Sequence, residues 1–110
     1  MLRKTLAEIE SKIRQSPNIP EDKKSEYFTL LQQLNDEVND LNKTDHERAE
    51  SVKEFTKVAA HESTRSEINP KLFQIALEGL SSSVQEFEVS HPRLVQTVNS
   101  ICTFLSKLGI

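Results

Sequence analysis

The chain has 110 residues, a formal net charge of −3, 35% hydrophobic residues, 2 glycines and 4 prolines. This length suits a single domain, residues 1–110, and so few turn residues exclude a fold of many strands. The single cysteine, Cys102, excludes an internal disulfide and a cysteine zinc site, and its apolar neighbours favour a small buried residue over a reactive thiol. No apolar run approaches the roughly 20 residues of a membrane span, and the N-terminus lacks the apolar block of a secretion signal, so we expect a cytoplasmic protein.

Charge is distributed unevenly along the chain. Residues 1–15 carry 4 Lys or Arg and 2 Glu, residues 93–110 carry 2 basic residues and no acid, and residues 16–92 carry 8 basic and 15 acidic residues. Both ends are therefore positive and the middle is negative. This distribution favours packing of the terminal helices against the central ones, within the chain or in a partner.

Apolar spacing and prolines mark the first two predicted helices. An apolar stripe with helical spacing predicts a helix over the N-terminal segment, which Pro17 and Pro20 end. Pro20 suits the first position of a second helix, because its missing N–H would have no partner there. The stripe of this second helix has the spacing of a coiled-coil seam. The two stripes consist of Leu2, Leu6, Ile9 and Ile13, and of Tyr27, Leu31, Leu34, Val38 and Leu41.

The segment Asn42–Asp45 allows two interpretations. Thr44 and Glu47 match the capping box that starts a helix, which favours a break near residue 43. The seven-residue apolar phase also continues to Val52, Phe55 and Ala59, so a single helix from Glu21 into the low sixties is the alternative.

Two further helices are predicted to begin with a cap followed by proline, at Asn69–Pro70 and at His91–Pro92. Gly109 is expected to adopt the left-handed conformation that ends a helix, with Ile110 folding back as its hydrophobic contact. The two apolar stripes are Phe73, Leu77, Leu80, Val84 and Phe87, and Leu94, Val98, Ile101, Leu105 and Leu108.

These segments predict an all-α fold, an antiparallel helical bundle of four to five helices with coiled-coil-like seams. Residues 1–42 would form an N-terminal helical hairpin and residues 43–110 the C-terminal helices. Because the total apolar content is low and is concentrated in narrow stripes, full burial of those stripes often requires a second chain. We therefore expect a homo-oligomer, with a dimer as the first expectation.

Candidate reactive residues have simpler structural explanations. His61-Glu62 resembles the start of an HExxH zinc motif, but Arg65 stands at the fifth position and cannot ligate a metal. His61, Glu62 and Arg65 are instead expected near one face at a helix end, where Glu62 pairs with Arg65. Neighbouring side chains such as Ser90 and His91 point apart and lack the surroundings of a catalytic serine. The segment Glu88–Pro92 is better explained as a corner between helices.

No catalytic, cofactor-binding or metal-binding residue is therefore predicted. Net acidity and the lack of a basic stripe with aromatics exclude a nucleic-acid partner. The N-terminal helix carries basic residues beside its apolar face and could lie on an anionic membrane, but Glu8 and Glu10 dilute that charge. Packing on another helix is the favoured interpretation.

The run Phe87–Leu94, which reads FEVSHPRL, and the closing run Leu105–Ile110 resemble the signature of a family of small bacterial helical proteins known as domain of unknown function 4404. Residues 2–13 and the helix from Tyr27 to Leu41 are similar to the N-terminal hairpin of that family. Residues 44–70 resemble an addition relative to its shorter members. The resemblance implies a bacterial, cytoplasmic, helical protein and carries over no catalytic residue.

Two functional hypotheses follow. The leading one is a self-associating protein-interaction or scaffold module without catalysis, which binds itself or another protein. The alternative is a regulatory or small-ligand-binding protein that uses a polar cluster between helices. The candidate residues for such a cluster or an interaction site are His61, Glu62, Arg65, Glu88, Ser90 and His91.

Overall fold

The computed structural model describes residues 2–108, and within this range the chain forms helices and no strand. The all-α prediction is confirmed. The helices are α1 (Leu2–Gln15), α2 (Glu21–Asn42), α3 (His46–Ser63), α4 (Pro70–Val84) and α5 (Pro92–Lys107), and the short 3₁₀ helix η1 (Gln85–Phe87) follows α4. None of these helices combines the length and the apolar character that crossing a membrane requires.

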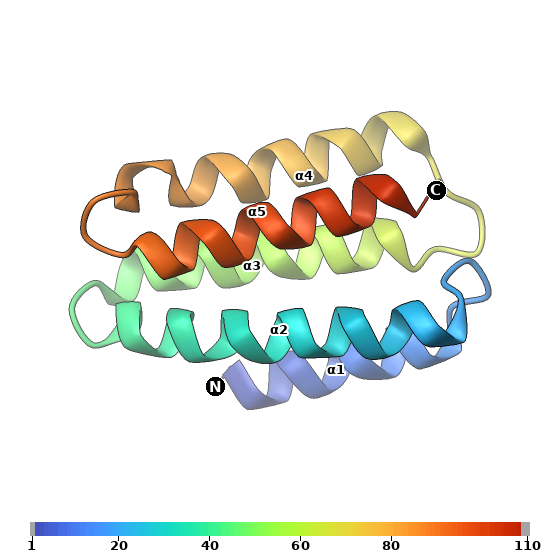
Figure 1. The fold of residues 1–110 in the computed structure, drawn as a ribbon, viewed down its shortest axis with the longest axis horizontal. Helices are drawn as coiled ribbons and strands as arrows, with labels where there is room; N and C mark the ends of the chain where they lie inside the picture. The colour runs from blue at the N-terminus through green and yellow to red at the C-terminus, as the bar shows by residue number, and fades with distance from the viewer. Residues whose placement is uncertain (1, 109–110) are drawn as a thin grey trace.

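The helices form an antiparallel bundle, as predicted (Figure 1). Each of α2, α3 and α4 packs against the next helix, and α5 packs back on α2, so these four helices close into a bundle. Helix α1 lies on the outside and packs on both α2 and α3. The radius of gyration is 13.0 Å, which is the value of about 13 Å expected for one folded chain of this length.

The predicted seams form the core of this single chain. One cluster of buried apolar side chains draws on all the α-helices, and Ile13, Leu41, Leu80, Leu94 and Leu105 are fully buried in it. Leu6, Leu77 and Leu108 pack against the cluster while partly exposed. The seams are therefore buried without a second chain, and low apolar content alone does not call for an oligomer.

The chain breaks between α2 and α3, as the favoured interpretation predicted. Helix α2 ends at Asn42, and α3 begins at His46. The predicted capping box at Thr44 is wrong, because the cap is Asp45, whose Oδ1 accepts a hydrogen bond from the Arg48 N–H at 3.1 Å. The Thr44 hydroxyl instead donates to the Leu41 carbonyl at 3.2 Å and closes the preceding turn.

The predicted starts of α4 and α5 agree with the structure, whereas the apolar stripe predicted as far as Phe87 runs past the end of α4 at Val84 into η1. Helix α4 starts as predicted, since the Asn69 side chain accepts hydrogen bonds from the Lys71 and Leu72 N–H groups, both at 3.1 Å. Pro20 is not the first residue of α2, because its ψ of 149° is extended and the helix starts at Glu21. The predicted stop at Gly109 and Ile110 lies outside the described residues.

Candidate functional site

The polar residues at the C-terminal end of α3 form a compact cluster. Arg65 Nη1 lies 3.0 Å from Glu62 Oε1, which confirms the expected pairing, and Glu62 is only 9% exposed. His61 Nε2 lies 3.9 Å from Glu62 Oε2, and the imidazole is exposed. The buried carboxylate is therefore held by one cation, and the histidine stands at the edge.

This end of α3 is tied to two other parts of the chain. The Ser63 hydroxyl, fully buried, lies 3.1 Å from the Tyr27 hydroxyl of α2. Asn18, in the connection between α1 and α2, donates through Nδ2 to the Arg65 carbonyl. Burial removes the Tyr27 phenol from water and raises its pKa to about 12. These bonds fasten the connection between α3 and α4 to the rest of the bundle.

The remaining candidate residues lie at the opposite end of the molecule. Glu88, Ser90 and His91 belong to the corner between η1 and α5, whereas His61, Glu62 and Arg65 lie at the connection between α3 and α4 (Figure 1). In that corner, His91 Nδ1 lies 3.0 Å from Ser90 Oγ, so the expectation that these neighbouring side chains point apart is wrong. His91 precedes α5 but makes no side-chain cap. The candidates thus form two separate groups, and no specific observation favours a ligand between them.

The described part of the chain has few side chains suited to metal binding or thiol chemistry. Residues 2–108 contain no group of three or more His, Cys, Asp or Glu side chains placed to hold a metal ion. Cys102 is half-buried, and this burial raises the pKa of its thiol. Its Sγ lies 3.8 Å from the Leu77 carbonyl, so the thiol contacts the neighbouring helix α4.

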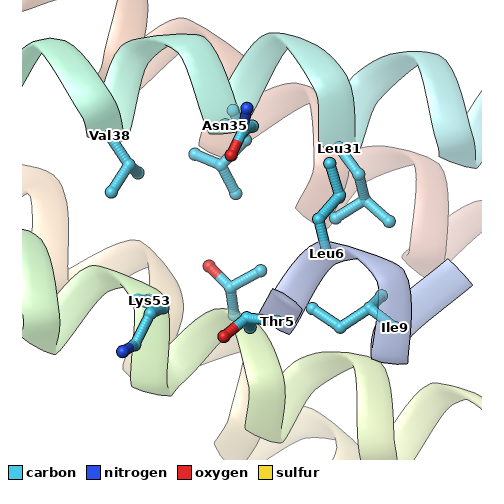
Figure 2. Close-up of a pocket in the computed structure, with 9 residues that line it drawn as sticks. Thr5, Leu6, Ile9, Leu31, Asn35, Val38 and Lys53 are labelled. Atoms are coloured by element: carbon cyan, nitrogen blue, oxygen red, sulfur yellow. The ribbon is translucent and has the colours of Figure 1, made fainter. Parts of the chain in front are cut away.

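A small cavity lies between α1, α2 and α3 (Figure 2), with a volume of about 20 Å³. By the same measure a water molecule needs roughly 10–15 Å³, so the cavity accommodates about one. Asn35 Oδ1 is buried beside it without a hydrogen-bond partner. The cavity is lined by Thr5, Leu6, Ile9, Leu31, Leu34, Asn35, Val38, Lys53 and Thr56.

Helices α3 and α4 carry four exposed large apolar side chains, Phe55, Val58, Leu72 and Ile75, which we call the apolar patch. These side chains are 40%, 46%, 43% and 52% exposed, respectively. Phe55 lies against Gly79, so the antiparallel pairing of the two helices brings Val58 beside the Ile75 region of α4. Sequence reasoning missed the patch, although Leu72, Ile75 and Gly79 continue with helical spacing beside the predicted α4 stripe.

Polar and charged side chains next to the patch residues in the sequence form pairs within their own helix. Lys57 Nζ lies 3.8 Å from Glu54 Oε2 on α3, and Gln74 Nε2 donates to Glu78 Oε1 at 3.1 Å on α4. Lys71 is exposed at the other end of α4. The border is therefore polar and carries charges of both signs, an arrangement common at the rim of protein interfaces.

Fold and surface together define a small antiparallel helical-bundle protein with an uncovered apolar face. Residues 28–110 match the family model described as Domain of unknown function (DUF4404), so the chain belongs to this family. The match confirms the predicted resemblance, includes residues 44–70 and begins after α1. Among curated proteins and among solved structures, no significant match to the chain is found.

Proposed function

We propose that the protein is a self-associating interaction module without catalysis, and that two copies meet through the apolar patch. One observation carries the proposal, namely the exposure of four large apolar side chains on the paired helices α3 and α4. Contiguous exposed apolar surface of this kind marks protein interfaces more often than isolated exposed residues do. Covering it removes apolar area from water, at about 25 cal/mol per Å².

The arrangement of charges on α4 favours a two-fold pairing of this helix with its copy. In an antiparallel pair of α4 helices centred on Ile75, Lys71 of one copy comes near Glu78 of the other, and the same contact occurs twice. Leu72 and Gly79 then flank the contact as positions on the shared seam. Opposite charges at such flanking positions set the orientation of paired helices. The patch is therefore self-complementary in charge as well as apolar.

A bacterial and cytoplasmic setting is part of the proposal. It rests on the family resemblance and on a single cysteine that has no disulfide partner within the chain.

Light scattering on the purified protein tests the proposal. The wild type should have about twice the monomer mass at high micromolar concentration, and Ile75→Glu should reduce it to the monomer because a charge then replaces the centre of the patch. Val89→Glu is the matched control, since Val89 is 95% exposed but lies in the corner before α5, away from the patch. A strictly monomeric wild type, or an unchanged mass in Ile75→Glu, would contradict the proposal.

A further inference from the structure

The cavity between α1, α2 and α3 has polar as well as apolar walls (Figure 2). Much of its lining is aliphatic and buried, as Ile9 and Leu31 are. Three further lining residues carry a side-chain oxygen, namely Thr5 on α1, Asn35 on α2 and Thr56 on α3. Each of the three helices around the cavity therefore contributes a polar side chain to it.

The side-chain oxygen of Asn35 lacks a hydrogen-bond donor. Asn35 Oδ1 is buried and has no partner among the described residues, 2–108. Figure 2 shows this oxygen directed away from α2, toward the side of the cavity on which Thr5 lies. A buried acceptor without a donor destabilises a fold, and almost all such groups in native proteins have a partner. The site therefore favours a small molecule that donates a hydrogen bond.

Thr56 offers a second acceptor in the same lining. Its hydroxyl is buried and donates to the Val52 carbonyl at 2.8 Å. A hydroxyl has one proton, so Thr56 Oγ1 can only accept in any further hydrogen bond. A molecule that donates two hydrogen bonds would satisfy Asn35 Oδ1 and Thr56 Oγ1 together.

Size and charge restrict the molecule further. The cavity volume is about 20 Å³, and a water molecule needs roughly 10–15 Å³ by the same measure. Lys53, which also lines the cavity, is 8% exposed, and its positive charge disfavours a cation. An anion would meet the acceptor oxygens of Asn35 and Thr56. A neutral donor of the size of water is the molecule that fits.

We propose that this cavity binds one structural water molecule, which donates to Asn35 Oδ1 and to Thr56 Oγ1 and so links α2 to α3 beneath α1. Buried waters in proteins typically make about three hydrogen bonds, and Thr5 provides a third polar group in the lining. The site is independent of self-association, because none of the four residues of the apolar patch lines the cavity.

Oxygen-17 magnetic relaxation dispersion tests the proposal, because it counts water molecules that exchange slowly with the bulk. Asn35→Leu removes the unpartnered acceptor and should hold one fewer long-lived water per chain than the wild type. Asn39→Leu is the matched control, since it makes the same change one helical turn further along α2 at an exposed position. The control should keep the wild-type count.

A second matched pair tests the role of Thr56. Thr56→Val keeps the shape of the side chain but removes the second acceptor, so it should also lose the long-lived water. Thr29→Val is its control, because the Thr29 hydroxyl makes the same kind of bond, to the Ser25 carbonyl at 3.1 Å, but is exposed. An unchanged count in Asn35→Leu or in Thr56→Val, or the same loss in either control, would overturn the proposal.

Xenon binding tests the wild-type protein without any substitution. Cavities that are dry and apolar bind xenon, whereas a cavity that holds a hydrogen-bonded water should not. The methyl resonances of Ile9, Leu31 and Val38, which line the cavity, should therefore keep their positions under xenon pressure. Saturable shifts of these three resonances would show a dry cavity and would contradict the proposed water.

Discussion

Phe55 of α3 lies so close to Gly79 of α4 that a Cβ atom on residue 79 would come within 2.8 Å of the Phe55 ring. Because Gly79 has no side chain, the Phe55 ring can pack directly on α4. Glycine costs roughly 1 kcal/mol relative to alanine inside a helix, so this contact is retained against local preference. It fixes the position of the largest side chain in the apolar patch.

Gly79→Ala should therefore weaken self-association while changing the free energy of unfolding little. The gain in helix propensity, about 1 kcal/mol, opposes the cost of moving the Phe55 ring, so the free energy of unfolding should change by less than about 1 kcal/mol. The displaced ring no longer fits the patch, and the dimer should weaken. Ser106→Ala on exposed α5 surface is the control, because it changes helix propensity without touching the patch. Denaturant unfolding and light scattering measure the two effects, and a dimer as strong as the wild type in Gly79→Ala would contradict this role of Phe55.

Tyr27→Phe should lower the free energy of unfolding by about 1 kcal/mol. The substitution removes the hydroxyl that lies 3.1 Å from Ser63 Oγ but keeps the ring, which packs 5.5 Å from the Phe104 ring between centroids. Ser63 keeps its hydrogen bond to the Ala60 carbonyl at 3.1 Å, so the remaining hydroxyl is not left unpartnered. Urea unfolding at neutral pH measures the change, and a loss above about 3 kcal/mol would mean that the ring packing is also disturbed.

The same residue predicts a loss of stability at alkaline pH. The pKa of Tyr27 rises from 10.0 to about 12 in the folded protein, so above pH 10 the unfolded chain releases a proton that the folded chain still holds. The stabilising contribution is complete below pH 10 and is lost as the pH rises through about 12, at roughly 1.4 kcal/mol per pKa unit. Tyr27 is the only tyrosine, so phenolate absorbance reports its ionisation directly. Tyr27→Phe should flatten this alkaline slope, and an unchanged slope in the variant would assign it to other groups.

A matched pair of substitutions tests where α3 begins. Asp45→Ala should cost about 1 kcal/mol, because the Asp45 carboxylate caps the Arg48 N–H. Thr44→Ala should cost less than about 0.5 kcal/mol, because its hydroxyl bonds only the Leu41 carbonyl at the end of the preceding helix. Thermal unfolding of both variants compares them. A larger loss of stability in Thr44→Ala than in Asp45→Ala would instead support the capping box predicted at Thr44.

The helices could be predicted from the sequence because apolar spacing and prolines act locally. Asn69–Pro70 and His91–Pro92 mark the starts of α4 and α5 wherever the helices later pack. The exact cap between α2 and α3 could not be predicted, since Thr44 and Asp45 are both good caps. Which of these two residues caps α3 depends on the backbone turn that the packing of α2 and α3 allows.

The surface features required the three-dimensional arrangement. Phe55 lies on the predicted seam of α3, yet it is 40% exposed because its ring turns onto Gly79 at the edge of the bundle. His61 and His91 both have polar neighbours in the sequence. The antiparallel order of α3, α4 and α5 nevertheless places the two histidines at opposite ends of the bundle. Distances between helices depend on packing, which no local pattern encodes.

The central claim, association through α4 about a two-fold axis at Ile75, is tested most directly by sedimentation equilibrium of charge-reversal variants. Lys71→Glu and Glu78→Lys should each weaken the wild-type dimer, because each places like charges together twice. The double variant, Lys71→Glu with Glu78→Lys, should restore the dimer constant to near the wild-type value. A wild type that sediments as a monomer, or a double variant no stronger than the two single variants, would contradict the account.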